Sequence, residues 1–144
     1  MGLADRFRAY AQAFEDAYAD DDWTRLEAYF TDDAIYDGGE GPGAVARGRE
    51  AVLARLKAGV DVFDRRFDSR ALRLVGDPRE EPGRVRAKLE LVCKKSGLPD
   101  CVISCTETAD FEGDRIAALR DVFDAEELAA IEAWMSRYGA RLDA

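Results

Sequence analysis

Two acidic residues occupy strand positions where the surrounding pattern calls for an apolar side chain. Between Cys101 and Phe111 the odd positions are otherwise apolar or small, and Glu107 falls among them. In the next strand-like run, Asp121 shares a face with Ala117, Leu119 and Phe123. Because an isolated buried charge is very costly, each carboxyl must be paired, protonated or open to a water-filled pocket.

Glu107 and Asp121 predict an acid/base pair if neighbouring antiparallel strands bring them together. Two close carboxylates do not both ionise easily, so one of them has a raised pKa. A carboxyl that titrates near neutral pH can act as a general acid or base. A third candidate catalytic residue is Asp37, which ends the first expected strand just before a glycine-rich segment.

Each of these carboxylates also has a purely structural interpretation. Glu107 can form a salt bridge within the sheet, to Arg86 or Arg120. Asp37 precedes two glycines and fits ordinary turn chemistry. Asp121 can accept hydrogen bonds from backbone amides at the start of the last helix. The feature that separates these interpretations is whether Glu107 and Asp121 face a solvent-connected cavity without Arg or Lys partners.

Aromatic residues supply candidates for the walls of a ligand pocket, although core packing explains the same pattern. The candidates are Tyr10, Phe14, Tyr18, Trp23, Phe63, Phe123 and Trp134. No metal site is expected, because the chain contains no histidine and its three cysteines lack metal-ligand spacing. We interpret Cys93, Cys101 and Cys105 as reduced thiols, and a hairpin can bring the first two together.

The elements that position these residues follow from the apolar period. Helices are predicted over about 3–20, 22–30, 48–67 and 125–142, the last opened by a capping box at 124–127. Strands are predicted at 34–37, 71–75, 85–93, 101–111 and 116–123, with turns at 76–83, 95–99 and 112–114. Residues 38–43 are expected to form a flexible rim of the pocket. This order, without βαβ units, indicates an α+β fold in one domain, 1–144.

Length and charge exclude several classes of protein. A chain of 144 residues buries a sizeable core without disulfides or a structural metal. Its net charge of -9 disfavours nucleic acid and anionic membranes as partners. The start, Met1 to Arg6, lacks the pattern of a signal peptide, and no run approaches the ~18 apolar residues of a membrane span, so a cytoplasmic location is expected.

Several segments together resemble one protein superfamily. They are the opening helix pair, the run from Tyr29 to Asp37, the helix start 48–52 and the run from Phe111 to Ile116. These look like the SnoaL-like and ketosteroid-isomerase-like branches of the nuclear transport factor 2-like superfamily, over nearly the whole chain. The resemblance implies a cone: a curved antiparallel sheet, N-terminal helices and a C-terminal helix around one pocket.

The ketosteroid isomerase pattern is only partly present. Its basic aspartate falls at Gly38, its donor tyrosine at Phe14 and its protonated acid at Glu107. Steroid isomerisation would therefore need Asp37 and either Tyr10 or Tyr18 as substitutes from shifted positions.

The SnoaL-like cyclases match better at the last strand. Where those enzymes have an acid/base aspartate in a Trp-Asp-Val run, this chain has Arg120-Asp121-Val122. The tryptophan is absent, as is the histidine common near the first strand of that family.

The resulting prediction is a SnoaL-like protein that binds a small, partly apolar molecule and forms a homodimer through the outer face of its sheet. As an enzyme it would use cofactor-free proton transfer in an isomerisation, cyclisation or hydration. Asp121 would be the base, Glu107 the acid or oxyanion partner, and Asp37 or Tyr18 a polar orienter. The alternative is a non-catalytic ligand-binding or assembly module with the same fold.

Overall fold

The period-two segments in the second half of the chain form the long strands of the fold. The computed structural model describes residues 2–39 and 44–143. Its strands are β1 (Phe30–Asp37), β2 (Val45–Arg47), β3 (Ser69–Leu74), β4 (Arg79–Glu81), β5 (Arg84–Lys94), β6 (Cys101–Glu112) and β7 (Arg115–Val122). Its helices are α1 (Leu3–Asp20), α2 (Arg49–Val62) and α3 (Ala125–Tyr138), with short 3₁₀ segments η1 (Trp23–Tyr29), η2 (Asp64–Arg66) and η3 (Gly139–Arg141).

Within the described residues, the strands form one seven-stranded sheet that is curved and open. Its order is β2-β1-β7-β6-β5-β3, and β4 pairs with the start of β5. Strands β5, β6 and β7 form an antiparallel meander, as the alternation predicts. The expectation of a wholly antiparallel sheet is wrong at one place, because β1 runs parallel to β7. No hairpin joins this pair, so a tight turn does not impose antiparallel pairing on it.

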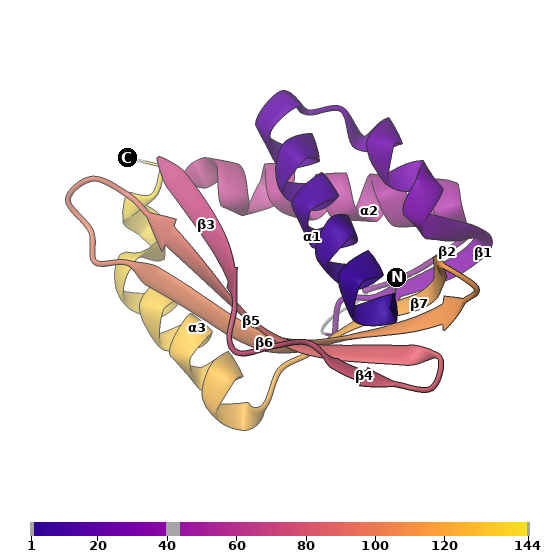
Figure 1. Cartoon of the computed structure of the whole chain (residues 1–144). Coiled ribbons are helices and arrows are strands. Elements are labelled where there is room, and N and C mark those ends of the chain that lie inside the picture. Colours follow the sequence, from indigo (N-terminus) through magenta and orange to yellow (C-terminus); the bar gives the residue numbers. More distant parts are fainter. Residues whose placement is uncertain (1, 40–43, 144) are drawn as a thin grey trace.

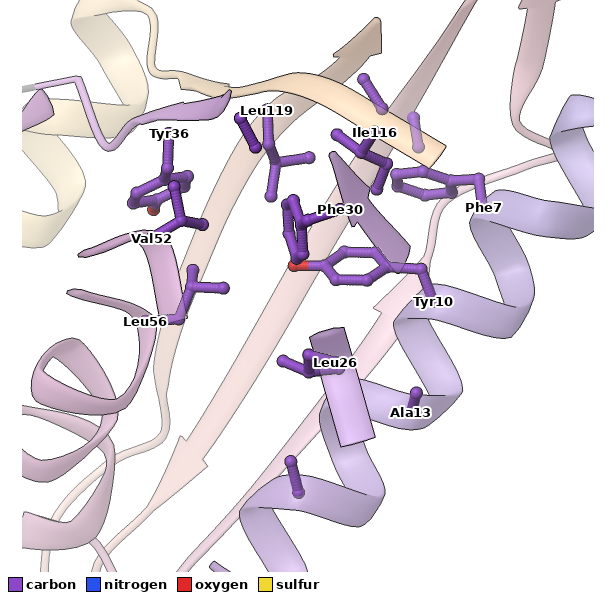
Figure 2. Close-up of a cluster of buried hydrophobic side chains, with 14 of the residues drawn as sticks. Phe7, Tyr10, Ala13, Leu26, Phe30, Tyr36, Val52, Leu56, Ile116 and Leu119 are labelled. Atoms are coloured by element: carbon purple, nitrogen blue, oxygen red, sulfur yellow. The ribbon is translucent and has the colours of Figure 1, made fainter. Parts of the chain in front are cut away.

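Helices α1 and α2 cover the same side of the sheet, and α3 lies apart from them beside β6 (Figure 1). The layer between α1, α2 and the sheet holds the larger core. Figure 2 shows side chains of α1, α2 and β7 gathered around Phe30, including Tyr10, Leu56 and Ile116. Phe7, Leu26, Phe30, Val52 and Ile116 are fully buried. This packing of helices on one face of a sheet is the α+β architecture that the element order predicted.

The first half of the chain departs from the predicted boundaries. The second helix is a 3₁₀ segment that ends at Tyr29, and Phe30 already belongs to β1. An irregularity in the β1–β7 register follows, between Phe30 and Ile35, and Asp32 and Asp33 within it are exposed. A bulge accommodates extra residues within a strand, so the polar run did not end it as expected. The predicted third helix ends at Val62, short of Phe63 and Phe67.

Two short strands lie where turns or loops were predicted. Strand β2 pairs with β1, and β4 pairs with the start of β5 across a turn at Pro82 and Gly83. Gly83 has a positive φ of 70°, which glycine adopts without strain. The predicted flexible rim, 38–43, lies partly outside the described residues, because 40–43 are not described.

The last helix begins at the predicted capping box. Asp124 accepts a hydrogen bond from the Glu127 amide, and the Glu127 side chain accepts one from the Asp124 amide. Trp134 of α3 packs on Phe67 and donates a hydrogen bond to the Pro99 carbonyl. The helix therefore closes a smaller core with Cys93, Cys101 and Leu142 at one end of the sheet.

Candidate active site

Strand register places Glu107 directly opposite Asp121. The hairpin that joins β6 to β7 pairs these two positions, and both side chains line the same cavity. On the other side of β6, Glu107 pairs with Ala87 of β5. The small alanine side chain leaves space for the Glu107 carboxyl. The alternation of β6 and β7 thus brings together the two carboxylates that depart from the apolar pattern.

Tyr36 completes this group from the parallel neighbour of β7. Its hydroxyl donates a hydrogen bond of 2.5 Å to Asp121 Oδ2. Tyr36 is buried, and burial raises its pKa well above the usual value, with the charge of Asp121 adding to the effect. The phenol therefore stays protonated at any ordinary pH and acts as a permanent donor to Asp121.

The pKa of Glu107 is raised well above its usual value. Burial is the main cause, followed by the charge of Asp121 and a hydrogen bond between the two carboxyls. Asp121 Oδ1 is buried and receives no hydrogen bond from any N–H or hydroxyl in the described part of the chain. A protonated Glu107 supplies the donor that this oxygen lacks, which makes Glu107–H with ionised Asp121 the arrangement that satisfies both groups.

The basic residues considered as partners of the pair are engaged elsewhere. Arg86 lies 3.4 Å from Glu81, and Arg120 lies 4.0 Å from Asp37. Within the described residues no Lys or Arg lies within salt-bridge distance of Glu107 or Asp121. The backbone-capping alternative for Asp121 also fails, because Asp124 caps α3.

The cavity beside the pair lies between α1, α2 and the sheet and is partly open to solvent. It has a volume of about 240 Å³, slightly below the ~300–1,000 Å³ usual for drug-sized ligands. Its walls are mostly apolar, and its charged and phenolic groups come from seven residues. They are Tyr10, Tyr36, Arg55, Asp64, Arg70, Glu107 and Asp121.

Three of the predicted aromatic residues line this cavity, namely Tyr10, Phe14 and Phe123. The burial of Tyr10, together with the charges of Glu107 and Asp121, raises the pKa of its phenol, so this hydroxyl also stays protonated.

The other four predicted aromatic residues pack against other side chains outside the cavity. Trp23 packs edge-on against Phe14 and donates to Asp21, and Phe63 packs on Phe67. Trp134 contacts Phe67 in the smaller core, and the ring of Tyr18 lies beneath the guanidinium of Arg65. None of the four belongs to the lining of the cavity in the described part of the chain.

Asp37 is separated from the carboxyl pair. It follows Tyr36 on β1 and so points to the other face, where its Oδ1 accepts a hydrogen bond from the Gly39 amide. This is the turn chemistry that the glycines suggested. The hydrogen bond to Asp121 Oδ2 comes from Tyr36, which was not one of the two predicted polar orienters, Asp37 and Tyr18.

Sequence reasoning missed Tyr36, Arg55, Asp64 and Arg70. The signal for Tyr36 was present, since Ala34 and Tyr36 form the inner face of β1 by alternation. Arg55 is half-buried on α2, and its guanidinium lies 5.8 Å from the centre of the Tyr36 ring. Nothing in the local pattern separates it from an ordinary solvated arginine.

No group of three or more potential metal ligands occurs within residues 2–39 and 44–143. The three cysteines are free and buried there, although Cys93 and Cys101 face each other across β5 and β6. None of the helices described combines the length and the apolar character needed to cross a membrane.

The fold described above, a curved sheet with helices on one face, agrees with the comparison by sequence. A model of the SnoaL-like domain matches residues 11–119. The chain therefore belongs to the SnoaL-like family, within the nuclear transport factor 2-like fold. No curated protein matches the sequence.

Solved structures show the same fold at low identity. A protein of Catenulispora acidiphila with a ketosteroid isomerase-like fold, in complex with trimethylamine, is 16% identical, with 86% of this chain and 92% of that chain covered and a TM-score of 0.62. A candidate polyketide cyclase of Xanthomonas campestris is 22% identical (90% and 99% covered, TM-score 0.56). An LEH-like epoxide hydrolase of M. tuberculosis is 15% identical (92% and 94% covered, TM-score 0.59).

Proposed function

We propose that this SnoaL-like protein binds a small, mostly apolar carbonyl compound and catalyses proton transfer next to the carbonyl group. The observation that carries the proposal is the direct pairing of Glu107 with Asp121 at the cavity wall, without a cationic partner in the described part of the chain. Structural ion pairs are the usual alternative for such carboxylates, and the positions of Arg86 and Arg120 speak against it.

The two carboxyls would have different catalytic roles because their protonation states differ. Asp121, ionised and held by Tyr36, takes a proton from the carbon next to the carbonyl, so a C–H bond breaks and an O–H bond forms. Glu107 gives its proton to the carbonyl oxygen, and the product of this step is the neutral enol. Return of the proton from Asp121 to another carbon, with the enol proton going back to Glu107, completes an isomerisation and restores both carboxyls.

Two features of the cavity support a carbonyl compound as the ligand. The apolar walls favour a ligand with little charge, and they strengthen the electrostatic effect of the few polar groups among them. Arg55 lines the cavity near Tyr36 and adds a positive charge that stabilises negative charge as it develops on the substrate oxygen.

Exchange of hydrogen for deuterium tests the proposal without knowledge of the natural substrate. Small cyclic and aryl ketones are incubated with the protein in D₂O, and loss of the proton signal next to the carbonyl is followed by NMR. We expect catalysed exchange for at least one ketone, reduced by about 10²-fold or more in Asp121→Asn and in Glu107→Gln.

Asp37→Asn is the matched control, because Asp37 lies outside the cavity, where it accepts a hydrogen bond from the Gly39 amide and lies 4.0 Å from Arg120. It should exchange like the wild type. Equal rates for Asp121→Asn and the wild type, with the fold intact, would overturn catalysis and favour the non-catalytic binding module.

The proposal also retains a homodimer through the outer face of the sheet. On that face Val102 and Val122 expose 44% and 47% of their surface. Sedimentation velocity of wild type and Val102→Glu tests this part: a dimer that dissociates in the variant supports it, and a monomeric wild type contradicts it.

A further inference from the structure

A second polar group lies on the cavity, apart from the carboxyl pair. Arg70 of β3 and Asp64 of η2 both line the cavity. The Arg70 side chain is only 3% exposed, yet its Nη1 lies 2.8 Å from Glu15 Oε2 and its Nε lies 2.9 Å from Asp64 Oδ2. The guanidinium also stacks against Tyr18, 4.7 Å from the ring centre. The Arg70 guanidinium is therefore a buried charge that carboxylates and an aromatic ring hold in place at the cavity wall.

The Arg70 guanidinium has hydrogen-bonding capacity to spare. Although Nε is close to Asp64, the N–H does not point at that oxygen, and it has no acceptor in the described part of the chain. A buried N–H without an acceptor is unfavourable, so a ligand acceptor that enters the cavity at this point gains a hydrogen bond that the protein alone does not provide. The group is therefore prepared to donate a hydrogen bond to a ligand.

The charge around Arg70 limits what that acceptor can be. One positive charge faces two carboxylates, Asp64 and Glu15, which leaves an excess of negative charge. Burial raises the pKa of Asp64 to about 6, against the opposing effect of the Arg70 charge and with a smaller raising effect from Glu15. An anionic ligand group would be repelled, whereas a hydroxyl can accept from Arg70 and donate to Asp64.

Strand register sets the distance between the two polar groups. Arg70 pairs with Cys93, which pairs with Cys101, whereas Glu107 lies six positions further along β6. At ~3.3 Å per residue, the backbone position of Cys101, which is in line with Arg70, is about 20 Å from that of Glu107 along β6. The curvature of the sheet brings the side chains at these two levels closer together. The rows between them present Leu72, Leu89, Leu91, Ile103 and Cys105 to the cavity.

We infer that the cavity takes an elongated, uncharged and mostly apolar molecule with a hydroxyl group at the end opposite its carbonyl. The hydroxyl binds between Arg70 and Asp64, and the apolar middle lies along β3, β5 and β6. This inference rests on the proposed function for the carbonyl end and adds the second anchor that selects the ligand.

Three synthetic ketones serve as probes because they differ only at the far end. They are 6-(4-hydroxyphenyl)hexan-2-one, 6-phenylhexan-2-one and 4-(5-oxohexyl)benzoate, measured by isothermal titration calorimetry at pH 7.5. The phenol should bind roughly fivefold to tenfold more tightly than the phenyl ketone, as one added hydrogen bond predicts. The benzoate should bind more weakly than the phenyl ketone by a similar factor.

The variant Asp64→Asn removes one negative charge and keeps the size of the side chain. It should reduce the advantage of the phenol and raise the affinity of the benzoate by about tenfold. The matched control is Asp61→Asn, three residues earlier, where the aspartate is paired with Lys57 and Arg65 on the surface. This control should leave the order of the three probes unchanged, and thermal unfolding verifies that both variants fold.

Two results would overturn the second anchor. One is equal affinity for the phenol and the phenyl ketone in the wild type, and the other is a benzoate that binds most tightly. Absence of binding by all three ketones would also overturn the inference that the cavity takes an elongated ligand. None of these results bears on the coupled protonation of Glu107 and Asp121, which is measured without a ligand.

Discussion

Glu107 and Asp121 face each other across β6 and β7, and the same register that pairs their backbones brings their carboxyls to one wall of the cavity. Neither can leave the pair without a change of strand register, which would turn every inner side chain of the strand outward. The acid/base hypothesis therefore depends on the backbone pairing of β6 with β7.

Removal of the Tyr36 hydroxyl should weaken the ionised state of Asp121. Tyr36→Phe deletes the 2.5 Å hydrogen bond to Asp121 Oδ2, at a cost of about 1–3 kcal/mol in the free energy of unfolding. The carboxyl pair should then titrate at higher pH, because its charged form has lost a donor. Chemical denaturation and carboxyl NMR measure the two effects.

Tyr29→Phe is the control for Tyr36→Phe, because Tyr29 is half-buried on η1 and its ring lies under Arg6. It should change neither the stability nor the titration by a comparable amount. An unchanged titration in Tyr36→Phe would show that the tyrosine does not influence the pair.

Stability should fall with rising pH because of Glu107. Its pKa in the folded protein lies well above the unfolded value, so the folded state binds the extra proton. Stability from this group is complete below the unfolded pKa of ~4.3 and is lost, by about 1.4 kcal/mol per pH unit, until pH reaches the folded pKa.

Glu107→Gln removes that dependence because its side chain does not titrate. The variant should be more stable than the wild type at pH 8 and of similar stability at pH 4.5, as measured by urea unfolding at both values. A wild type whose stability rises between pH 5 and 8 relative to Glu107→Gln would contradict the raised pKa.

The strands of the meander were predictable from sequence because their side chains alternate and turns separate them. Alternation indicated that Glu107 and Asp121 each lie on the apolar face of their own strand. Their direct pairing also needs the register shift between Asp110 and Phe111, because the register at the turn would otherwise pair Glu107 with Arg120. Tyr36 could not be joined to them in this way. Strand β1 reaches β7 through a parallel pairing that spans most of the chain, and no local pattern encodes such a contact.

The cluster around Arg70 could not be predicted for a related reason. On β3, Arg70 shares a face with Leu72 and Leu74, which is the same kind of signal that singled out Glu107, but its partners Asp64 and Glu15 come from separate elements. The bend of the chain at η2, which brings Asp64 inward, lies where the helical period was predicted to continue. The position of Arg70 on an apolar face was a readable signal, but the assembly of its cluster from three elements was not.

Filling the cavity should separate ligand binding from folding. Ile103 lines the cavity, and Ile103→Phe should remain within about 1 kcal/mol of the wild type in stability, because the cavity has room for the ring. Binding of 6-phenylhexan-2-one should be lost, as measured by calorimetry. The adjacent Val102 is exposed on the opposite face of β6, so Val102→Phe should bind the ketone normally.

If Ile103→Phe and Val102→Phe bind 6-phenylhexan-2-one equally well, the cavity is not its binding site. If both variants unfold, the stability part of the prediction is wrong, and Ile103→Met provides a smaller change at the same position.

The cysteines of the smaller core should be unreactive in the folded protein. Burial raises the pKa of Cys93 to about 12 and that of Cys101 to about 11. At pH 8 Cys101 then has ~100-fold and Cys93 ~1,000-fold less thiolate than an ordinary cysteine, and only the thiolate reacts. Iodoacetamide should modify both residues only after denaturation, as mass spectrometry can follow, and rapid labelling of the native protein would disprove this packing.

The central claim is that Glu107 and Asp121 share one proton near neutral pH, and carboxyl-carbon NMR titration measures this directly. Wild type, Glu107→Gln and Asp121→Asn are compared with the carboxyl carbons labelled. We predict that one carboxyl of the wild type titrates well above its ordinary value of ~4, and that its titration shifts when the partner is replaced. Two carboxyls that titrate at or below that value, each indifferent to the other, would contradict the account and leave a binding or structural role.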